Sequence, residues 1–467
     1  MSRKMKSFEV KSLKIEDIST KGLGVGKDDG RVFFIAGTVP GDIVNVTAFR
    51  KKRGYWEARL DTIETPSPNR IEAACAYFGL CGGCKWQHLD YKSQLHFKDK
   101  EVRHNLTHIG KVTAEDYLPI LAAPDTYYYR NKMEFSFSNQ RWLTAEEIAS
   151  DKPIERKGVG FHKPGMWDKV VDIEQCHLQA DPSNAIRNFI RTYALEQQLD
   201  FFNPREQSGF LRNLMIRTSS TTETMVLLQF FRNDQKAIKA LLTSLLEEFP
   251  SITSLLYCVN NKGNDSIYDQ EIKAFTERTY IEEKMGDLTF QISAKSFYQT
   301  NSKQAEKLYE RVKEFASLQS DEIVYDLYTG TGTIAQFVSD ECQKVIGIES
   351  VPDAITAAKA NALNNNISNV TFEVGDMKDC FNEDFIQKHG KAQVVITDPP
   401  RNGMHPKVVD QLLRLAPERI VYVSCNSATQ ARDLALMKDQ YKLVKSQAVD
   451  LFPQTQHVEN IVLLHRI

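Results

Sequence analysis

The sequence has no long hydrophobic run, and this absence excludes a membrane-embedded protein. None of its stretches approaches the roughly 18 consecutive apolar residues that a membrane-spanning helix needs. The first residues, MSRKMKSFEV, lack the apolar core of a signal peptide. We therefore expect a cytoplasmic protein with no membrane partner.

Cysteine is scarce and the net charge is small. Eight cysteines in 467 residues are too few for a disulfide framework, and a net charge of −2 does not by itself indicate a polyanionic partner. The charge is nevertheless uneven, because residues 1–60 carry 13 Lys and Arg against 7 Asp and Glu, whereas the rest carries 46 against 54. A basic segment on a mildly acidic body fits a nucleic-acid-binding appendage, and a solvated basic face is the alternative.

Three segments differ in their patterns. Residues 1–65 alternate as about five short strands, which predicts a small OB-like barrel, and the stretch FRKKRGYWEAR interleaves basic and aromatic residues as RNA-binding surfaces do. Residues 66–290 have a mixed α+β pattern. Residues 291–467 alternate apolar strands with Ala-rich helices, which predicts an α/β fold with a doubly wound, mostly parallel sheet.

Acidic residues end successive predicted strands of the last segment. The first of these strands leads into Asp326-Leu-Tyr-Thr-Gly-Thr-Gly-Thr333, whose glycines allow a ligand to approach the backbone closely. The next three end at Glu349, Asp376 and Asp398, where carboxylates can meet a ribose or an adenine amine. This order resembles the class I S-adenosylmethionine (SAM) methyltransferases; a dehydrogenase-type Rossmann domain is the alternative.

A cysteine and a carboxylate lie near the last two predicted strands. Cys425, in Ser-Cys-Asn, follows the fifth strand and is expected to face the cofactor crevice, although a lone cysteine is more often structural. Glu459 begins the final apolar strand, where it is either a buried functional group or a surface carboxylate. A thiolate that attacks carbon 6 of a pyrimidine activates carbon 5 for methylation, and a base must then remove the carbon-5 proton.

These motifs together resemble the RNA (uracil-5-)-methyltransferases, more narrowly the branch with a TRAM domain and an iron–sulfur cluster that methylates 23S ribosomal RNA. The resemblance implies that Cys425 is the nucleophile and Glu459 the base. It implies SAM binding by Gln299, Tyr328, Glu349 and Asp398, to which we add Thr333 and Asp376. It places Phe297 and Gln299 beside the target base, and we expect Arg130 and Arg401 to contact RNA.

Three cysteines cluster as Cys75-x5-Cys81-x2-Cys84, and a fourth ligand is needed to complete a metal site. Cys176 is the best candidate. Spacing alone leaves structural zinc and a 4Fe–4S cluster open, and the resemblance favours the 4Fe–4S cluster.

The sequence therefore predicts a SAM-dependent enzyme, a monomer, that methylates carbon 5 of a uridine in RNA. Ribosomal RNA is the favoured substrate and transfer RNA the alternative. Cytidine methylation is disfavoured because Asp398-Pro-Pro-Arg401 lacks a second cysteine. A non-catalytic, metal-stabilised RNA-binding protein is the rival from another class.

Overall fold

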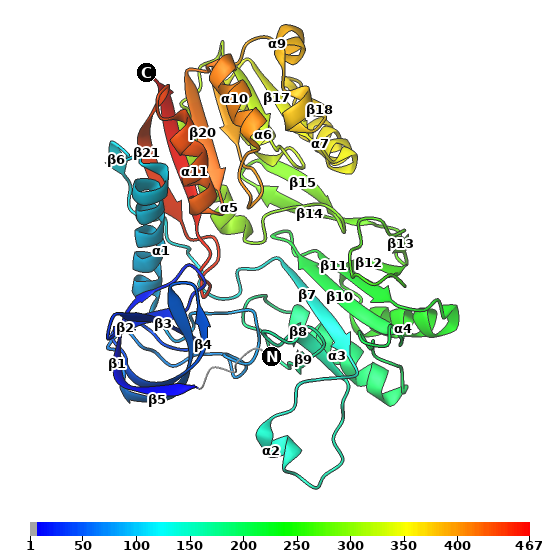
Figure 1. Cartoon of the computed structure of the whole chain (residues 1–467). Helices are drawn as coiled ribbons and strands as arrows, with labels where there is room; N and C mark the ends of the chain where they lie inside the picture. The colour runs from blue at the N-terminus through cyan, green and yellow to red at the C-terminus, as the bar shows by residue number, and fades with distance from the viewer. Residues whose placement is uncertain (1–6) are drawn as a thin grey trace.

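A computed structural model describes residues 7–467 and contains a closed barrel and two large sheets (Figure 1). The barrel has the strand order β1-β2-β3-β5-β4. Its strands are β1 (Phe8–Ile18), β2 (Gly24–Asp28), β3 (Arg31–Ile35), β4 (Ile43–Lys52) and β5 (Tyr55–Thr65). Alternate apolar side chains such as Ile15, Phe33 and Val46 are fully buried inside it, as the period of two along a strand requires.

The second sheet has seven strands in the order β13-β12-β11-β10-β7-β8-β9. These are β7 (Lys132–Ser138), β8 (Gly158–His162), β9 (Val170–Asp172), β10 (Leu211–Thr218), β11 (Thr224–Phe230), β12 (Ile252–Val259) and β13 (Lys273–Ala274). The helices of this part are α2 (Ala145–Ile148), α3 (Ser183–Glu196) and α4 (Gln235–Glu248). A two-stranded ribbon, β14 (Tyr280–Met285) and β15 (Leu288–Ser293), lies between this sheet and the third (Figure 1).

The third sheet has eight strands in the order β18-β17-β16-β19-β20-β22-β21-β6. Five neighbouring strands are parallel to one another: β16 (Ile323–Leu327), β17 (Lys344–Glu349), β18 (Val370–Val374), β19 (Val394–Thr397) and β20 (Arg419–Ser424). Strand β22 (Glu459–Arg466) is antiparallel to β20 on one side and to β21 (Tyr441–Val449) on the other. The predicted doubly wound α/β fold is thereby confirmed. Its helices are α5 (Ser302–Ala316), α6 (Thr333–Phe337), α7 (Pro352–Asn364), α8 (Met377–Cys380), α9 (Glu383–His389), α10 (Pro406–Leu415) and α11 (Ser427–Met437).

One segment joins a sheet that the sequence pattern did not assign to it. Residues 66–290 were expected to form a separate middle part, but α1 (Tyr91–Asn105), the π-helical turn after it (Leu106–Gly110) and β6 (Asp116–Tyr117) belong with the third sheet. Strand β6 pairs in parallel with β21, and α1 lies along α11 and β21 (Figure 1). The third sheet is therefore completed by residues far upstream of its other strands.

Among residues 7–467, no helix is long and apolar enough to cross a membrane.

Candidate active site at the strand ends of the third sheet

The strand register brings Cys425 and Glu459 to one edge of the third sheet. Ser424, the last residue of β20, is paired with Asn460 of β22. Cys425 follows Ser424 directly, and Glu459 precedes Asn460. Because the two strands are antiparallel neighbours, the thiol and the carboxyl group lie beside each other although 34 positions separate them in the sequence.

The turn that carries Cys425 is held by hydrogen bonds on both sides. The Asn426 side chain caps α11 by accepting from the backbone N–H groups of Ala428 and Thr429, at 3.1 and 3.4 Å. The same side chain donates to the Arg401 carbonyl at 3.0 Å, as does the Thr429 hydroxyl at 3.1 Å. These bonds join the Cys425 turn to the loop after β19, and sequence reasoning did not assign Asn426 this role.

The Cys425 thiol is a weak acid in this environment. Burial raises its pKa to about 11, and the nearby Glu459 and Asp398 carboxylates contribute in the same direction. The exposed Arg401 side chain opposes them by favouring the thiolate. Glu459 is 5% exposed, and burial, followed by the charge of Asp398, raises its pKa to about 8. This carboxyl group can therefore hold or accept a proton near neutral pH.

Two further carboxyl groups lie near this pair, the partly buried Asp398 and the buried Asp326. Burial raises the pKa values of Asp398 and Asp326 to about 7. Asp326 accepts from the Thr329 hydroxyl and from the Ala335 backbone N–H at 3.1 Å. The Tyr309 hydroxyl of α5 lies near both carboxyl groups, and burial raises its pKa. Tyr309 was not predicted as a site residue, because its place on an amphipathic helix is typical of core.

The predicted cofactor residues surround the glycine turn between β16 and α6. The Glu349 carboxylate accepts from the Gly330 N–H at 3.2 Å and from the Ser350 N–H at 2.7 Å, so its position is set by the turn. Gly332 has a φ of 75°, and a Cβ there would lie 2.5 Å from the Phe372 ring, so only glycine fits.

The other predicted cofactor residues differ in exposure. Tyr328 is half-buried with a φ of 65°, and burial raises the pKa of its hydroxyl to about 12. Thr333 is buried as the first residue of α6. Asp376 is exposed, where an ion pair with Lys378 at 2.5 Å lowers its pKa, so this carboxylate is already engaged.

The predicted base-contacting residues lie on the loop after β15. Phe297 is 64% exposed, and Gln299 follows it two residues later on the same loop. Asn131 holds this loop: its amide donates to the Gln299 carbonyl at 2.9 Å, and its backbone N–H donates to the Thr300 carbonyl at 2.7 Å. Arg130 lies with its guanidinium 5.3 Å from the centre of the Phe452 ring.

The four predicted metal ligands lie near one another without forming a metal site. Cys81 and Cys84 have thiol pKa values raised to about 11 and 12, first by burial and then also by the neighbouring Cys75 and Cys176. All four are free thiols. Within residues 7–467, however, no group of three or more His, Cys, Asp or Glu side chains is arranged to hold a metal ion. The donor chemistry suits a metal, the arrangement does not, and the predicted cluster is not confirmed.

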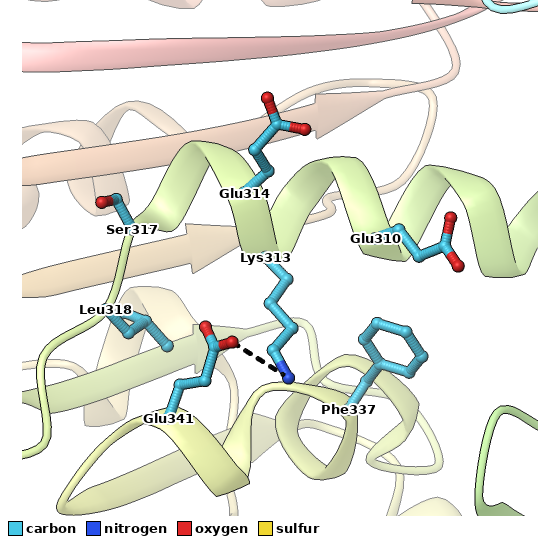
Figure 2. A pocket seen from close by; sticks show the side chains of 7 residues that line it. All are labelled: Glu310, Lys313, Glu314, Ser317, Leu318, Phe337 and Glu341. Atoms are coloured by element: carbon cyan, nitrogen blue, oxygen red, sulfur yellow. Dashed lines mark ion pairs between the residues drawn. The ribbon is translucent and has the colours of Figure 1, made fainter.

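A surface hollow on the outer side of α5 contains none of these residues. Figure 2 shows Lys313 reaching toward Glu341, with which it forms an ion pair at 3.3 Å, between Phe337 and Leu318. Four of its seven lining residues are charged, and Lys313 and Glu341 already pair with each other. We assign it no role in the site.

Comparison with known proteins places these features in a family. A model described as tRNA (Uracil-5-)-methyltransferase matches residues 267–467, and the TRAM domain model matches residues 4–60. An RNA methyltransferase of Porphyromonas gingivalis is 53% identical over 462 residues, which cover 97% of this chain and 99% of the relative. One of Bacteroides thetaiotaomicron is 50% identical over 451 residues, covering 96% and 99%.

A solved structure has a similar fold over the whole chain. The Pyrococcus abyssi tRNA (uracil-54, C5)-methyltransferase, in complex with S-adenosyl-L-homocysteine, has a TM-score of 0.75 and 27% identity, and the match covers 98% of this chain and 100% of that one. The barrel is thus a TRAM domain and the third sheet a SAM-methyltransferase domain. The chain belongs to the RNA (uracil-5-)-methyltransferase family and is a SAM-dependent RNA methyltransferase.

Proposed function

We propose that the protein methylates carbon 5 of a uridine in RNA through a covalent bond between Cys425 and the base. The observation that carries this proposal is the pairing of β20 with β22, which places a thiol beside a buried carboxyl group. Methylation of an exocyclic nitrogen or oxygen requires no thiol, whereas carbon 5 needs a nucleophile at carbon 6 to become reactive.

The steps follow from the groups present. The Cys425 thiol gives its proton to solvent and its sulfur bonds to carbon 6, which turns the ring into an enolate. Carbon 5 takes the methyl group that SAM supplies, and S-adenosylhomocysteine leaves. Glu459, as carboxylate, removes the proton from carbon 5; the ring double bond re-forms and the bond from sulfur to carbon 6 breaks. Arg401 assists the first step because its charge favours the thiolate.

The target base must leave its stack to reach this edge of the sheet, since carbons 5 and 6 of a stacked base are covered. The exposed Phe297 ring supports this step, because an exposed aromatic ring beside the site can stack on an extruded base. The basic, aromatic strands β4 and β5 of the TRAM barrel supply a surface for the RNA backbone.

We propose large-subunit ribosomal RNA as the first candidate substrate. This choice rests on the resemblance that the barrel and the four cysteines carry. Transfer RNA is the second candidate. A specific observation favours it: the P. abyssi structure, which matches nearly the whole chain, is named a tRNA (uracil-54, C5)-methyltransferase. Mapping the methylated position in total cellular RNA distinguishes the two.

The 4Fe–4S cluster at Cys75, Cys81, Cys84 and Cys176 stays a prediction. The proximity of four free thiols supports it: burial, and then the neighbouring Cys75 and Cys176, raise the pKa values of Cys81 and Cys84, and a bound metal would stabilise their thiolates. The methyl transfer itself needs no electron, so no step above depends on the cluster.

The test uses RNA labelled with tritium at carbon 5 of uridine. The purified protein and SAM should release tritium into water, Cys425→Ala should abolish the release, and Glu459→Gln should accumulate a covalent RNA–protein adduct. Cys342→Ala, which removes a buried thiol of the same domain away from the strand ends, is the matched control. Methyl transfer without tritium release would mean that another atom is methylated. If neither methyl transfer nor tritium release occurs on ribosomal or transfer RNA, the result favours a non-catalytic RNA-binding protein.

A further inference from the structure

The segment that leads into Glu459 is held by an unusual number of partners. Residues 450–458, here called the base loop, connect β21 to β22. Four consecutive carbonyl groups of this loop, those of residues 451–454, accept hydrogen bonds from four different parts of the chain. The donors are the Asn301 amide to Leu451 at 3.0 Å, Lys98 to Phe452 at 3.0 Å, the Tyr129 hydroxyl to Pro453 at 2.9 Å, and the Lys85 and Trp86 N–H groups to Gln454 at 2.9 and 3.0 Å.

Two residues of α1 make the most deeply buried of these contacts. Gln94 and Lys98 are one helical turn apart on the same face, and both are fully buried. Lys98 forms an ion pair with Asp450 at 2.6 Å in which neither side chain is exposed. The Gln94 amide exchanges two hydrogen bonds with Gln454: its nitrogen donates to the Gln454 side chain at 3.0 Å, and its oxygen accepts from the Gln454 N–H at 2.9 Å.

The backbone of the base loop needs this support. Gln454 has a φ of 66°, in the left-handed region that residues with a side chain rarely adopt. Such a conformation is unfavourable and persists only where surrounding contacts determine it. A fully buried ion pair contributes little net stability, so we infer that the Lys98–Asp450 pair serves to fix the geometry of the loop.

The same contacts reach the RNA-binding barrel and the cysteine segment. The Lys85 and Trp86 N–H groups that bind Gln454 directly follow Cys84, and the Trp86 indole donates to the Gly22 carbonyl of the barrel at 3.3 Å. The base loop is thus a junction between α1, the cysteine segment and the catalytic sheet.

We propose that Gln94 and Lys98 are positioning residues for the release step. They hold the base loop so that Glu459 meets the carbon-5 proton of the methylated base, which places a specific catalytic task on a helix outside the catalytic part of the sequence. The inference rests on the proposed function, because it assumes that Glu459 is the base that ends a covalent intermediate.

The consequence is specific to one step. The Cys425 turn is held by the hydrogen bonds of Asn426 to the Arg401 carbonyl and to α11, and by Asn105 of α1, whose amide donates to the Ser427 hydroxyl at 2.8 Å. Gln94 and Lys98 take no part in these bonds. Loss of the Gln94 and Lys98 contacts alone should therefore leave adduct formation intact and slow adduct breakdown by about tenfold or more, because displacing a reacting group by about 1 Å can cost about 10²-fold in rate.

The experiment measures adduct formation and breakdown separately in the full-length protein. Gln94→Leu removes the amide pair with Gln454 at similar volume, together with the bonds that the same amide donates to the Trp86 and Leu89 carbonyls at 3.1 and 2.8 Å. Lys98→Met alone would leave Asp450 buried without a partner and is prone to unfolding, so the double variant Lys98→Met/Asp450→Asn removes both charges. Val102→Ala, one turn further along α1 and 1% exposed, removes buried apolar contact but no hydrogen bond or ion pair to the base loop, and is the control for lost stability.

The proposal is supported if a denaturation-stable RNA–protein adduct accumulates in Gln94→Leu and in the double variant but not in Val102→Ala. The KM for SAM should stay within about twofold of the wild-type value in these variants. Loss of activity that only follows the folded fraction, with no adduct, overturns it. Glu459→Gln calibrates the assay. If an adduct accumulates in Glu459→Gln but not in the Gln94 and Lys98 variants, the positioning role is refuted while the covalent mechanism stands. No adduct in Glu459→Gln refutes the covalent mechanism and, with it, this inference.

Discussion

The raised pKa of Glu459 makes the release step depend on pH in a direction that can be calculated. Burial raises this pKa to about 8, and the charge of Asp398 adds to the effect. Only the ionised carboxylate can remove the carbon-5 proton. At pH 7 roughly one molecule in ten carries ionised Glu459, and at pH 9 roughly nine in ten do, since each pKa unit is a factor of ten. Release should therefore speed up about tenfold between pH 7 and pH 9.

The assay must separate release from thiol attack, because the Cys425 thiol, with a pKa of about 11, also becomes more reactive as the pH rises. Adduct formed at pH 6 is transferred rapidly to buffers between pH 6 and pH 9, and its breakdown is followed by tritium release. Glu459→Gln should break down at least about 10²-fold more slowly and without this pH dependence, as expected when a general base is removed. Breakdown by the wild-type protein at a constant rate across the range would refute Glu459 as the base.

Four further changes have defined outcomes. Arg401→Met should raise the pKa of Cys425 and so move the rising limb of the pH profile for adduct formation to higher pH. Because Arg401 is exposed, we expect thiol attack at pH 7 to slow by only about threefold to tenfold. A rising limb at unchanged pH would contradict the role of Arg401. Cys425→Ser should abolish turnover while calorimetry shows SAM affinity within about twofold of the wild type, whereas residual turnover would exclude the thiol as nucleophile. Cys84→Ser should remove the iron and acid-labile sulfide expected in anaerobically purified protein, and wild-type protein free of iron would eliminate the cluster. Arg419→Met should break the two hydrogen bonds to Glu322 at 2.5 and 2.6 Å and lower the free energy of unfolding by about 2–3 kcal/mol. Adduct formation should be unchanged. An unchanged Tm in thermal unfolding would show that the pair contributes nothing to stability.

The features that depend on local sequence could be predicted. The alternation of apolar strands and helices is a local signal, so it indicated the α/β sheet and the carboxylates at its strand ends. Glu349 is the last residue of its strand and Asp398 follows its strand directly, so their places could be read from the order of the motifs. The barrel was equally accessible, because its strands are consecutive and separated by short turns.

The features that depend on non-local pairing could not be predicted. Nothing in residues 91–117 indicates that α1 and β6 join a sheet whose other strands begin two hundred residues later. The proximity of Cys425 to Glu459 depends on β22 returning antiparallel beside β20, which the two motifs alone do not specify. Gln94 and Lys98 are polar residues on an ordinary helix until their buried partners on the base loop are known.

The completion of the third sheet by β6 and α1 limits how this protein can be divided. A fragment that begins at residue 291 would contain the sequence matched to SAM binding and to the nucleophile, but β21 would have an unpaired edge and Asp450 would be buried without its cation. Exchange of the front half with that of a relative would likewise need Gln94 and Lys98 to match the incoming base loop. Recombination between family members should therefore succeed only where α1 and the base loop are inherited together.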